Sequence, residues 1–311
     1  MPEIRHLVIP ADHAGKRLDQ SLAELFPEYS RSRLQAWIDA GLVTVAGAPA
    51  SRKQKVWGGE AVALTPESLP EETAFRAEAI GLDIVHEDDA ILVVDKPAGL
   101  VTHPGAGNWE GTLLNALLHH HPGAAAIPRA GIVHRLDKDT SGLMVVAKTL
   151  EAQTQLVRQL QARDVKRVYW AVALGVFQRP AGDIDAAIGR HPTQRVKMAV
   201  LDDRHAGAKP ALTHWKVLRQ YARAAWVECR LATGRTHQIR VHLTHLGHPL
   251  LGDPVYRGRT PGSPIPFPRQ ALHAVRLGLV HPVTGEFMEW EAPPPADFAQ
   301  LLETLEARDA D

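Results

Sequence analysis

The chain has 311 residues, of which 45% are hydrophobic and 23% are charged, so it can form one large or two modest folded domains and is not of disordered composition. Lys and Arg together number 35, as do Asp and Glu, and this zero net charge gives no argument for nucleic-acid binding from bulk charge. The one cysteine, Cys229, excludes a disulfide framework, and no apolar run approaches the roughly 20 residues that span a bilayer, so we expect a cytoplasmic protein without membrane association.

Residues 1–65 predict a small α/β domain. Lys16–Phe26 has its leucines on one face, as in an amphipathic helix, and Ser30 is a suitable N-cap for a second helix that ends before Gly41. A strand at Leu42–Val45 and a hairpin follow. Two short helices and a hairpin make a compact unit that is small for a free-standing core.

This unit resembles the small RNA-binding domain first described in a ribosomal small-subunit protein. The similarity lies in Arg17-Leu18-Asp19, in Ser30–Gln35 at the start of the second helix, and in Gly41–Val45. A helix N-terminus also offers backbone N–H groups to phosphate. A solvated helix face is the alternative interpretation. The resemblance implies RNA contacts by five basic residues: Arg31, Arg33, Arg52, Lys53 and Lys55.

Residues 66–80 contain prolines and glutamates with little apolar periodicity, and they predict a linker. The following residues mix strand-like and helix-like runs without a regular βαβ repeat. The expected elements are a strand pair within Ile84–Pro97, helices at Thr112–His121 and Leu150–Arg163, and strands at Ile132–Val133, Leu143–Ala147, Val168–Leu174, Ala225–Ala232 and Ala271–Val280. We therefore expect an α+β fold with a mixed, mainly antiparallel sheet flanked by helices.

Charged residues are segregated along this second region. Residues 67–95 and 286–311 are acidic apart from one arginine in each, Arg76 and Arg308. From Arg190 to Arg259, 13 basic residues stand against four acidic ones. This pattern predicts a basic face inside a neutral protein, and a coincidence of solvated faces is the alternative.

A polar loop between two apolar runs is the first candidate site. It spans His134–Gly142, between Ile132–Val133 and Leu143–Ala147. Asp137 lies where its carboxylate can be held at a cleft. Asp139 makes a paired-carboxylate hydrolase an alternative, although two acids at i and i+2 on a loop have no defined spacing across a substrate. Ordinary turn chemistry is a third explanation of Asp137.

Other chemistries lack their motifs. His134–Asp137 invites comparison with the kinase catalytic loop, but the downstream Asn, the Gly-rich loop and the strand lysine are missing. Neither a Gly-x-Ser-x-Gly nor a Gly-x-x-x-x-Gly-Lys motif occurs. His119–His121 end an apolar helix without a Cys or carboxylate at ligand spacing, so we expect no metal site there.

Residues His134–Met144 resemble the signature of the RluA-type pseudouridine synthases. The resemblance continues at Val168–Ala171 and at Gly234–His242, and it spans nearly the whole chain as far as Trp290. Chance similarity does not produce three separate motifs in the same order. Several local stretches, among them Gly252–Tyr256, are closer to the RluD subgroup of this family.

The resemblance implies an enzyme that isomerises uridine in RNA to pseudouridine without a metal or cofactor. Asp137 would be the catalytic residue, either as a nucleophile at the sugar or as a base that promotes glycal formation. Tyr169 would stack on the flipped base and assist proton removal, and Arg240 would pair with Asp137. Arg135 would hold the base out of the stack. Four more substrate-binding residues are expected in the same motifs: His134, Arg235, His237 and Gln238.

The resemblance further implies a monomeric enzyme whose partner is large-subunit (23S) ribosomal RNA, at the stem-loop of the bridge between the subunits. Recognition would then rest on phosphate contacts and stacking. Residues 1–65 would be the RNA-binding domain, 66–80 the linker and 81–311 the pseudouridine synthase domain. The alternatives are the same reaction at another ribosomal or transfer RNA site, and a ribosome assembly factor that binds RNA without turnover.

Overall fold

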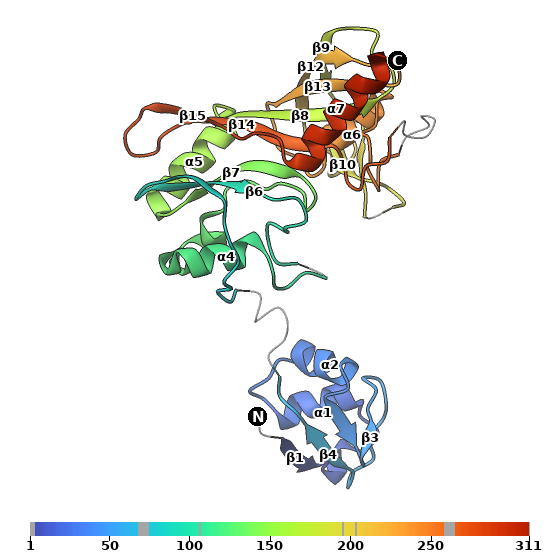
Figure 1. The fold of residues 1–311 in the computed structure, drawn as a ribbon. Coiled ribbons are helices and arrows are strands. Elements are labelled where there is room, and N and C mark those ends of the chain that lie inside the picture. Colours follow the sequence, from blue (N-terminus) through green and yellow to red (C-terminus); the bar gives the residue numbers. More distant parts are fainter. Residues whose placement is uncertain are drawn as a thin grey trace. The chain divides into compact units, whose positions relative to one another are not determined.

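The computed structural model describes residues 4–67, 75–105, 107–194, 196–202, 204–257 and 265–310. The chain divides into two compact units, Met1–Ala74 and Phe75–Asp311 (Figure 1). Residues 68–74 of the expected linker lie outside the described part. The side-chain amide of Asn115 donates to the carbonyl of Arg76 at 2.8 Å, and the amide of Glu78 donates to the carbonyl of Asn115 at 3.0 Å. The second unit therefore begins before residue 81.

The first unit packs two helices against a small antiparallel sheet. Its described elements are β1 (Arg5–Val8), a 3₁₀ helix (Ala11–His13), α1 (Leu18–Leu25), α2 (Arg31–Asp39), β2 (Val43–Val45), β3 (Ala48–Pro49) and β4 (Ala61–Leu64). The strands pair in the order β1-β4-β2-β3. Ser30 caps α2 as expected, because its hydroxyl accepts the amide of Arg33 at 3.3 Å. Leu22, Leu34 and Val62 belong to a separate buried core.

The second unit is built on one large sheet. Its strands and helices are β5 (Ile84–Glu87), β6 (Ile91–Lys96), α4 (Leu113–His120), two 3₁₀ turns (Pro122–Ala126, Pro128–Gly131), β7 (Ser141–Ala147), α5 (Leu150–Ala162), β8 (Lys166–Leu174), β9 (Ala181–Asp185), β10 (Ile188–Arg190), β11 (Met198–Val200), β12 (Leu212–Gln220), β13 (Ala224–Leu231), α6 (Gln238–His245), β14 (Leu272–Val280), β15 (Phe287–Glu291) and α7 (Ala296–Ala310). Among the described residues, nine strands pair in the order β5-β6-β7-β14-β8-β13-β12-β9, with β15 on β14. Of the described pairs, only β7 with β14 is parallel. The expected mixed, mainly antiparallel sheet is confirmed.

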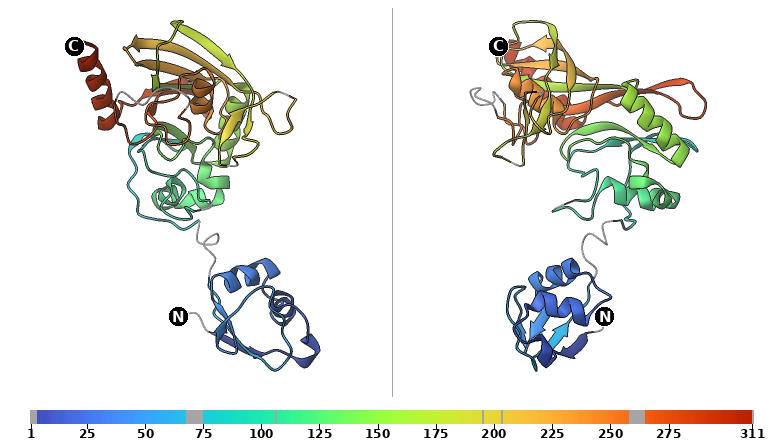
Figure 2. Two further views of the ribbon diagram at one scale, coloured as in Figure 1. Left: turned by 90° about the vertical axis from the view of Figure 1, so that its right-hand side faces the viewer. Right: turned by 180° about the vertical axis from the view of Figure 1, so that it is seen from behind.

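Alternate residues along the strands bury the two faces of this sheet under different helices. On β7, Met144 packs into the core that includes α4 and α6, whereas Val145 packs into the core that includes α5. Helix α7 covers the same side as α5, further along the sheet, where Phe298 contacts the core around Val172 (Figure 2). No helix in the described ranges has the length and apolar character needed to cross a membrane.

One expected strand is absent from the described structure. Ile132 makes only an isolated bridge to Val146, and the chain from there to Thr140 is an irregular loop over β7. The close approach of the chain to β7 at Gly131 explains why no strand forms here. Gly131 has φ +79°, and a Cβ at that position would collide with the carbonyl of Ala147. The backbone therefore turns sharply where the apolar pair suggested an extended strand.

Candidate active site

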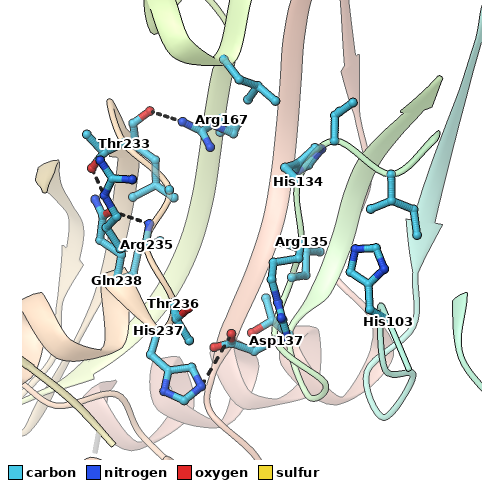
Figure 3. A pocket seen from close by; sticks show the side chains of 18 of the residues that line it. His103, His134, Arg135, Asp137, Arg167, Thr233, Arg235, Thr236, His237 and Gln238 are labelled. Atoms are coloured by element: carbon cyan, nitrogen blue, oxygen red, sulfur yellow. Dashed lines mark hydrogen bonds and ion pairs between the residues drawn. The ribbon is translucent and has the colours of Figure 1, made fainter. Parts of the chain in front are cut away.

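A cavity of about 840 Å³ opens on the sheet face that α4 and α6 cover (Figure 3). Three segments far apart in the sequence build its wall: residues 132–137, strand β8 and residues 231–240. They bring together all eight site residues expected in the second unit: His134, Arg135, Asp137, Tyr169, Arg235, His237, Gln238 and Arg240. The contacts of each side chain decide what it can offer to a ligand.

Arg240 joins two carboxylates. Its Nη1 donates to Oδ2 of Asp137 at 3.0 Å, while its Nε and Nη2 bind both oxygens of Asp253 at 2.7 and 3.0 Å. Burial alone would lower the pKa of Arg240, but the hydrogen bonds and charges of Asp253 and Asp137 raise it above its ordinary value. Asp253 also accepts the amides of Val255 and Tyr256. This bracing fixes the guanidinium against Asp137.

Asp253 was not among the predicted site residues. It lies in Gly252–Tyr256, and the resemblance of that stretch to one subgroup was the only sign in the sequence that it matters. Its carboxylate is fully buried and reaches Arg240 from 13 residues further along the chain. A pairing of this kind depends on how the loop after α6 folds back, which no local pattern reports.

His237 faces the second oxygen of Asp137. Its Nε2 lies 3.9 Å from Oδ1 of Asp137, and its Nδ1 lies 2.8 Å from the hydroxyl of Tyr256. That hydroxyl also accepts the amide of Met198 at 2.8 Å, which holds Tyr256 beside the imidazole. Burial lowers the pKa of His237, although the charge of Asp137 opposes this. A largely neutral imidazole therefore lies beside the Asp137 carboxylate.

Tyr169 and His134 form part of the cavity wall. Tyr169 is 5% exposed, and burial raises the pKa of its phenol, so the hydroxyl stays protonated at neutral pH. Nε2 of His134 accepts the amide of Val145 at 3.1 Å, and burial lowers the pKa of His134 to about 3. His134 is thus a neutral brace that ties the Asp137 loop to β7. Arg135, in contrast, is exposed at the cavity.

Gln238 differs from its expected substrate-binding role. Its side-chain oxygen accepts from the Thr233 hydroxyl at 2.8 Å and the Arg235 amide at 2.9 Å, and its nitrogen donates to the Leu212 carbonyl and the Thr213 hydroxyl at 3.0 Å each. These four bonds use the hydrogen-bonding capacity of the amide inside the protein. Gln238 therefore shapes the loop from Thr233 to His237. Arg235 donates through Nε to the carbonyl of Pro210 and is partly exposed.

The cavity is strongly basic. Among its described lining residues, Asp137 is the one acid. The arginines that line it are Arg129, Arg135, Arg163, Arg167, Arg235 and Arg240. Such a lining favours a polyanion.

The basic face that the charge pattern predicted differs from this cavity. Only two lining arginines, Arg235 and Arg240, come from the stretch 190–259, whose Arg195 and Arg259 lie outside the described residues. Three others of that stretch are paired with nearby acids: Arg204 with Asp202, Arg219 with Glu306 and Arg230 with Glu228. The fold therefore pairs part of this stretch with acids, while four of the six arginines that line the cavity come from elsewhere in the chain.

The consecutive histidines His119–His121 do not gather further ligands. Nε2 of His120 lies 2.9 Å from a carboxylate oxygen of Glu87. In the described part of the chain, no group of three or more His, Cys, Asp or Glu side chains could hold a metal ion.

In the first unit, a buried acid binds one of the predicted basic residues, Arg31. Asp19 is fully buried, and its carboxylate binds Arg31 at 2.8 Å, Gln35 at 2.6 Å and Arg17 at 3.0 Å. Burial would raise the pKa of Asp19, but these hydrogen bonds lower it to about 2. Arg52 pairs with exposed Asp39.

The other predicted RNA contacts of this unit are distributed around α2 and the hairpin. The Arg33 guanidinium lies 5.5 Å from the centre of the Trp37 ring. Lys53 and Lys55 are exposed. The five residues therefore comprise two arginines in ion pairs, one arginine over an aromatic ring and two exposed lysines.

Comparison with known proteins gives matches in both units. Residues 90–245 match the family model described as RNA pseudouridylate synthase, and residues 16–62 match the S4 domain. The chain is 54% identical to a ribosomal large subunit pseudouridine synthase D from Nitrosomonas europaea, with 96% of this chain and 87% of the relative covered. The enzyme of the same name from Haemophilus influenzae is 52% identical, with 99% and 97% covered.

A solved structure carries the same fold. Human RNA Pseudouridylate Synthase Domain Containing 1 is 30% identical, with a TM-score of 0.56 over 74% of this chain and 97% of that chain. Together with the matching family model and relatives, it confirms the expected pseudouridine synthase fold and S4 domain. The chain therefore belongs to the family of RNA pseudouridine synthases.

Proposed function

We propose that this enzyme converts specific uridines of large-subunit ribosomal RNA to pseudouridine, as a monomer, and that Asp137 is its catalytic residue. The observation that carries the proposal is the buried Asp253–Arg240–Asp137 array at a basic cavity. The names of the relatives support the choice of RNA. Such a substrate also supports the expectation of a cytoplasmic protein.

The reaction requires a uridine to leave the RNA stack and enter the cavity. The bond between C1′ of the ribose and N1 of uracil breaks, the base turns, and C5 of uracil bonds to C1′. Asp137, oriented by the hydrogen bond from Arg240 at 3.0 Å, either attacks C1′ or removes a proton from the sugar. Tyr169 provides a stacking surface and assists loss of the C5 proton, and exposed Arg135 fills the space that the flipped base leaves.

We also infer that the first unit is a second RNA-binding surface, joined to the second unit by the expected linker, whose residues 75–80 belong to the second unit. Two tethered binding surfaces raise the effective concentration of one at the other. The exposed sides of Arg17 and Arg31, together with Lys53 and Lys55, supply cations for phosphate.

The test is Asp137→Asn in cells that carry only the variant, followed by mapping of pseudouridine in ribosomal and transfer RNA. We expect the pseudouridines made by this enzyme to be lost from large-subunit RNA. Asp139→Asn is the matched control, because it makes the same charge change in the same loop outside the cavity lining.

Pseudouridine at normal levels in the Asp137→Asn strain would overturn the catalytic assignment and favour an RNA-binding assembly factor. A loss confined to transfer RNA would keep the chemistry and replace the substrate.

A further inference from the structure

The cavity contains a buried cation that the proposed chemistry does not yet use. Arg167 lies on β8, two residues before Tyr169, so both side chains project from the same face of the sheet. Arg167 is 7% exposed and lines the cavity. Figure 3 shows its guanidinium beside the Thr233 segment, across the cavity from His134.

This guanidinium is poorly satisfied by the protein. Its Nε has no hydrogen-bond partner within the described ranges, and its Nη2 reaches the carbonyl of Leu231 only at 3.5 Å. The other deeply buried arginines of the unit are each bound by a carboxylate: Arg240 by Asp253 and Arg269 by Asp297. A buried charge without such a partner is costly, which indicates that a ligand completes it.

The neighbouring backbone leaves room for Arg167. A Cβ at Gly234 would lie 2.7 Å from Nη1 of Arg167. The absent side chain at Gly234 therefore allows the guanidinium to lie against the Gly234 backbone. The motif Gly234–His242 thus accommodates one arginine and supplies another, Arg240.

The position of Tyr169 indicates which part of a nucleotide meets Arg167. Tyr169 follows Arg167 by two residues on the same face of β8, and both line the cavity that also contains Asp137. A uridine with its sugar at Asp137 and its base on Tyr169 extends the far edge of the base toward Arg167. The exposed arginines Arg135 and Arg163 are better placed for phosphates, which remain near solvent.

We propose that the Arg167 guanidinium donates a hydrogen bond to a carbonyl oxygen of the flipped uracil and stabilises the base as it leaves the sugar. This inference rests on the proposed function. When the C1′–N1 bond breaks, its electron pair stays on uracil and spreads onto both carbonyl oxygens. When C5 bonds to C1′, the pair enters the new bond, and on the nucleophilic route the Asp137 carboxylate leaves C1′. The C5 proton is then lost and N1 takes up a proton, so that the product is a neutral isomer of uridine. Arg167 keeps all its protons throughout.

The experiment compares Arg167→Met with wild type on a short RNA that contains a uridine the wild-type enzyme is first shown to modify. We expect the single-turnover rate to fall roughly 100-fold, the loss typical for one donor to a developing anion, with RNA affinity changed less than about threefold. Lys166→Met is the matched control, since Lys166 is the neighbouring cation on the opposite sheet face, over Phe287. It should leave the rate unchanged.

Thio-substituted RNA separates this contact from a structural role. Sulfur is a weak hydrogen-bond acceptor. We therefore place 2-thiouridine or 4-thiouridine at the target. The one whose sulfur replaces the oxygen that Arg167 contacts should slow wild type more than it slows Arg167→Met. If Arg167→Met fails to fold, Gly234→Ala, which displaces the guanidinium, should show the same reduced sensitivity to sulfur.

Equal sensitivity of wild type and variant to both thiouridines would overturn the proposal. The proposal would also be overturned if a methylphosphonate beside the target slowed wild type but not Arg167→Met, because Arg167 would then be a phosphate contact. A wild-type enzyme that forms no pseudouridine in any ribosomal RNA would instead refute the proposed function, so the two failures are distinct.

Discussion

Each of the two units contains a carboxylate held by arginine, and the difference between these arrangements separates binding from chemistry. In the first unit the acid is hidden: the Asp19 side chain is 0% exposed, while Arg17 and Arg31 around it are 39% and 45% exposed. In the second unit the arginine is hidden: the Arg240 side chain is 5% exposed and that of Asp137 is 17% exposed. In each unit, the proposed function assigns the less buried partner to contact with RNA.

The physical consequence follows from charge. The buried Asp19 carboxylate orients two partly exposed arginines, and such an arrangement suits a surface that binds phosphates. Arg240 binds Asp253 through two of its nitrogens and Asp137 through one, which suits a surface that presents one oriented carboxylate in an otherwise basic cavity. Loss of the buried partner should therefore damage affinity in the first unit and rate in the second.

Arg240→Ala should have the largest effect. Asp137 loses its partner and Asp253 becomes an unpaired buried acid, so we expect a single-turnover rate roughly 1,000-fold lower and a loss of stability of about 3–5 kcal/mol. RNA affinity should change by less than about fivefold. Arg235→Ala is the control, since the side chain of Arg235 lines the same cavity but, in the described structure, bonds the carbonyl of Pro210 and no carboxylate. A variant that binds RNA weakly but reacts normally when saturated would reduce Arg240 to a phosphate contact.

Asp19→Asn should have an intermediate effect, and this effect should be on RNA affinity and not on the reaction rate. Without the acid, Arg17 and Arg31 lose their common anchor, and we expect RNA affinity to fall roughly tenfold, the scale of one or two lost phosphate contacts. The single-turnover rate at saturating RNA should stay the same. Asp39→Asn breaks only the exposed pair with Arg52 and should change affinity less than about twofold. Equal effects of the two variants, or a slower saturated rate for Asp19→Asn, would contradict the contrast between the units.

Acid sensitivity of the first unit should be the smallest effect. The pKa of Asp19 is about 2 in the fold, below the ordinary 3.8. Because the folded value is the lower one, the network stabilises the unit fully above about pH 4 and loses this contribution as the pH falls from about 4 to about 2. Hydrogen exchange in β2 and β4 should therefore differ most between wild type and Asp19→Asn near pH 4, and little near pH 2. A difference independent of pH would show that the charge of Asp19 does not matter.

The sequence predicted helices, strands and caps wherever a single stretch of residues determines them. The Ser30 cap, the strand at 143–147 and the helix at 150–163 follow from capping and periodicity, and the structure has them within two residues. The strand expected at Ile132–Val133 does not form, because the close approach of Gly131 to β7 overrides the preference of two apolar residues for an extended strand. A run that short contains too little information to outweigh a tertiary contact.

The sequence by itself determined the α+β fold class, the resemblance to a family and the set of residues gathered at one cavity, because motif, period and order are properties of neighbouring residues. Only the tertiary structure decided which charges remain available. It buried Asp253 against Arg240, turned the Gln238 amide inward, paired Arg219 with Glu306 and left Arg167 without a carboxylate partner in the described chain. The reason is physical: ionisation and hydrogen bonding depend on burial and on partners tens of residues away, and those distances do not exist until the chain folds.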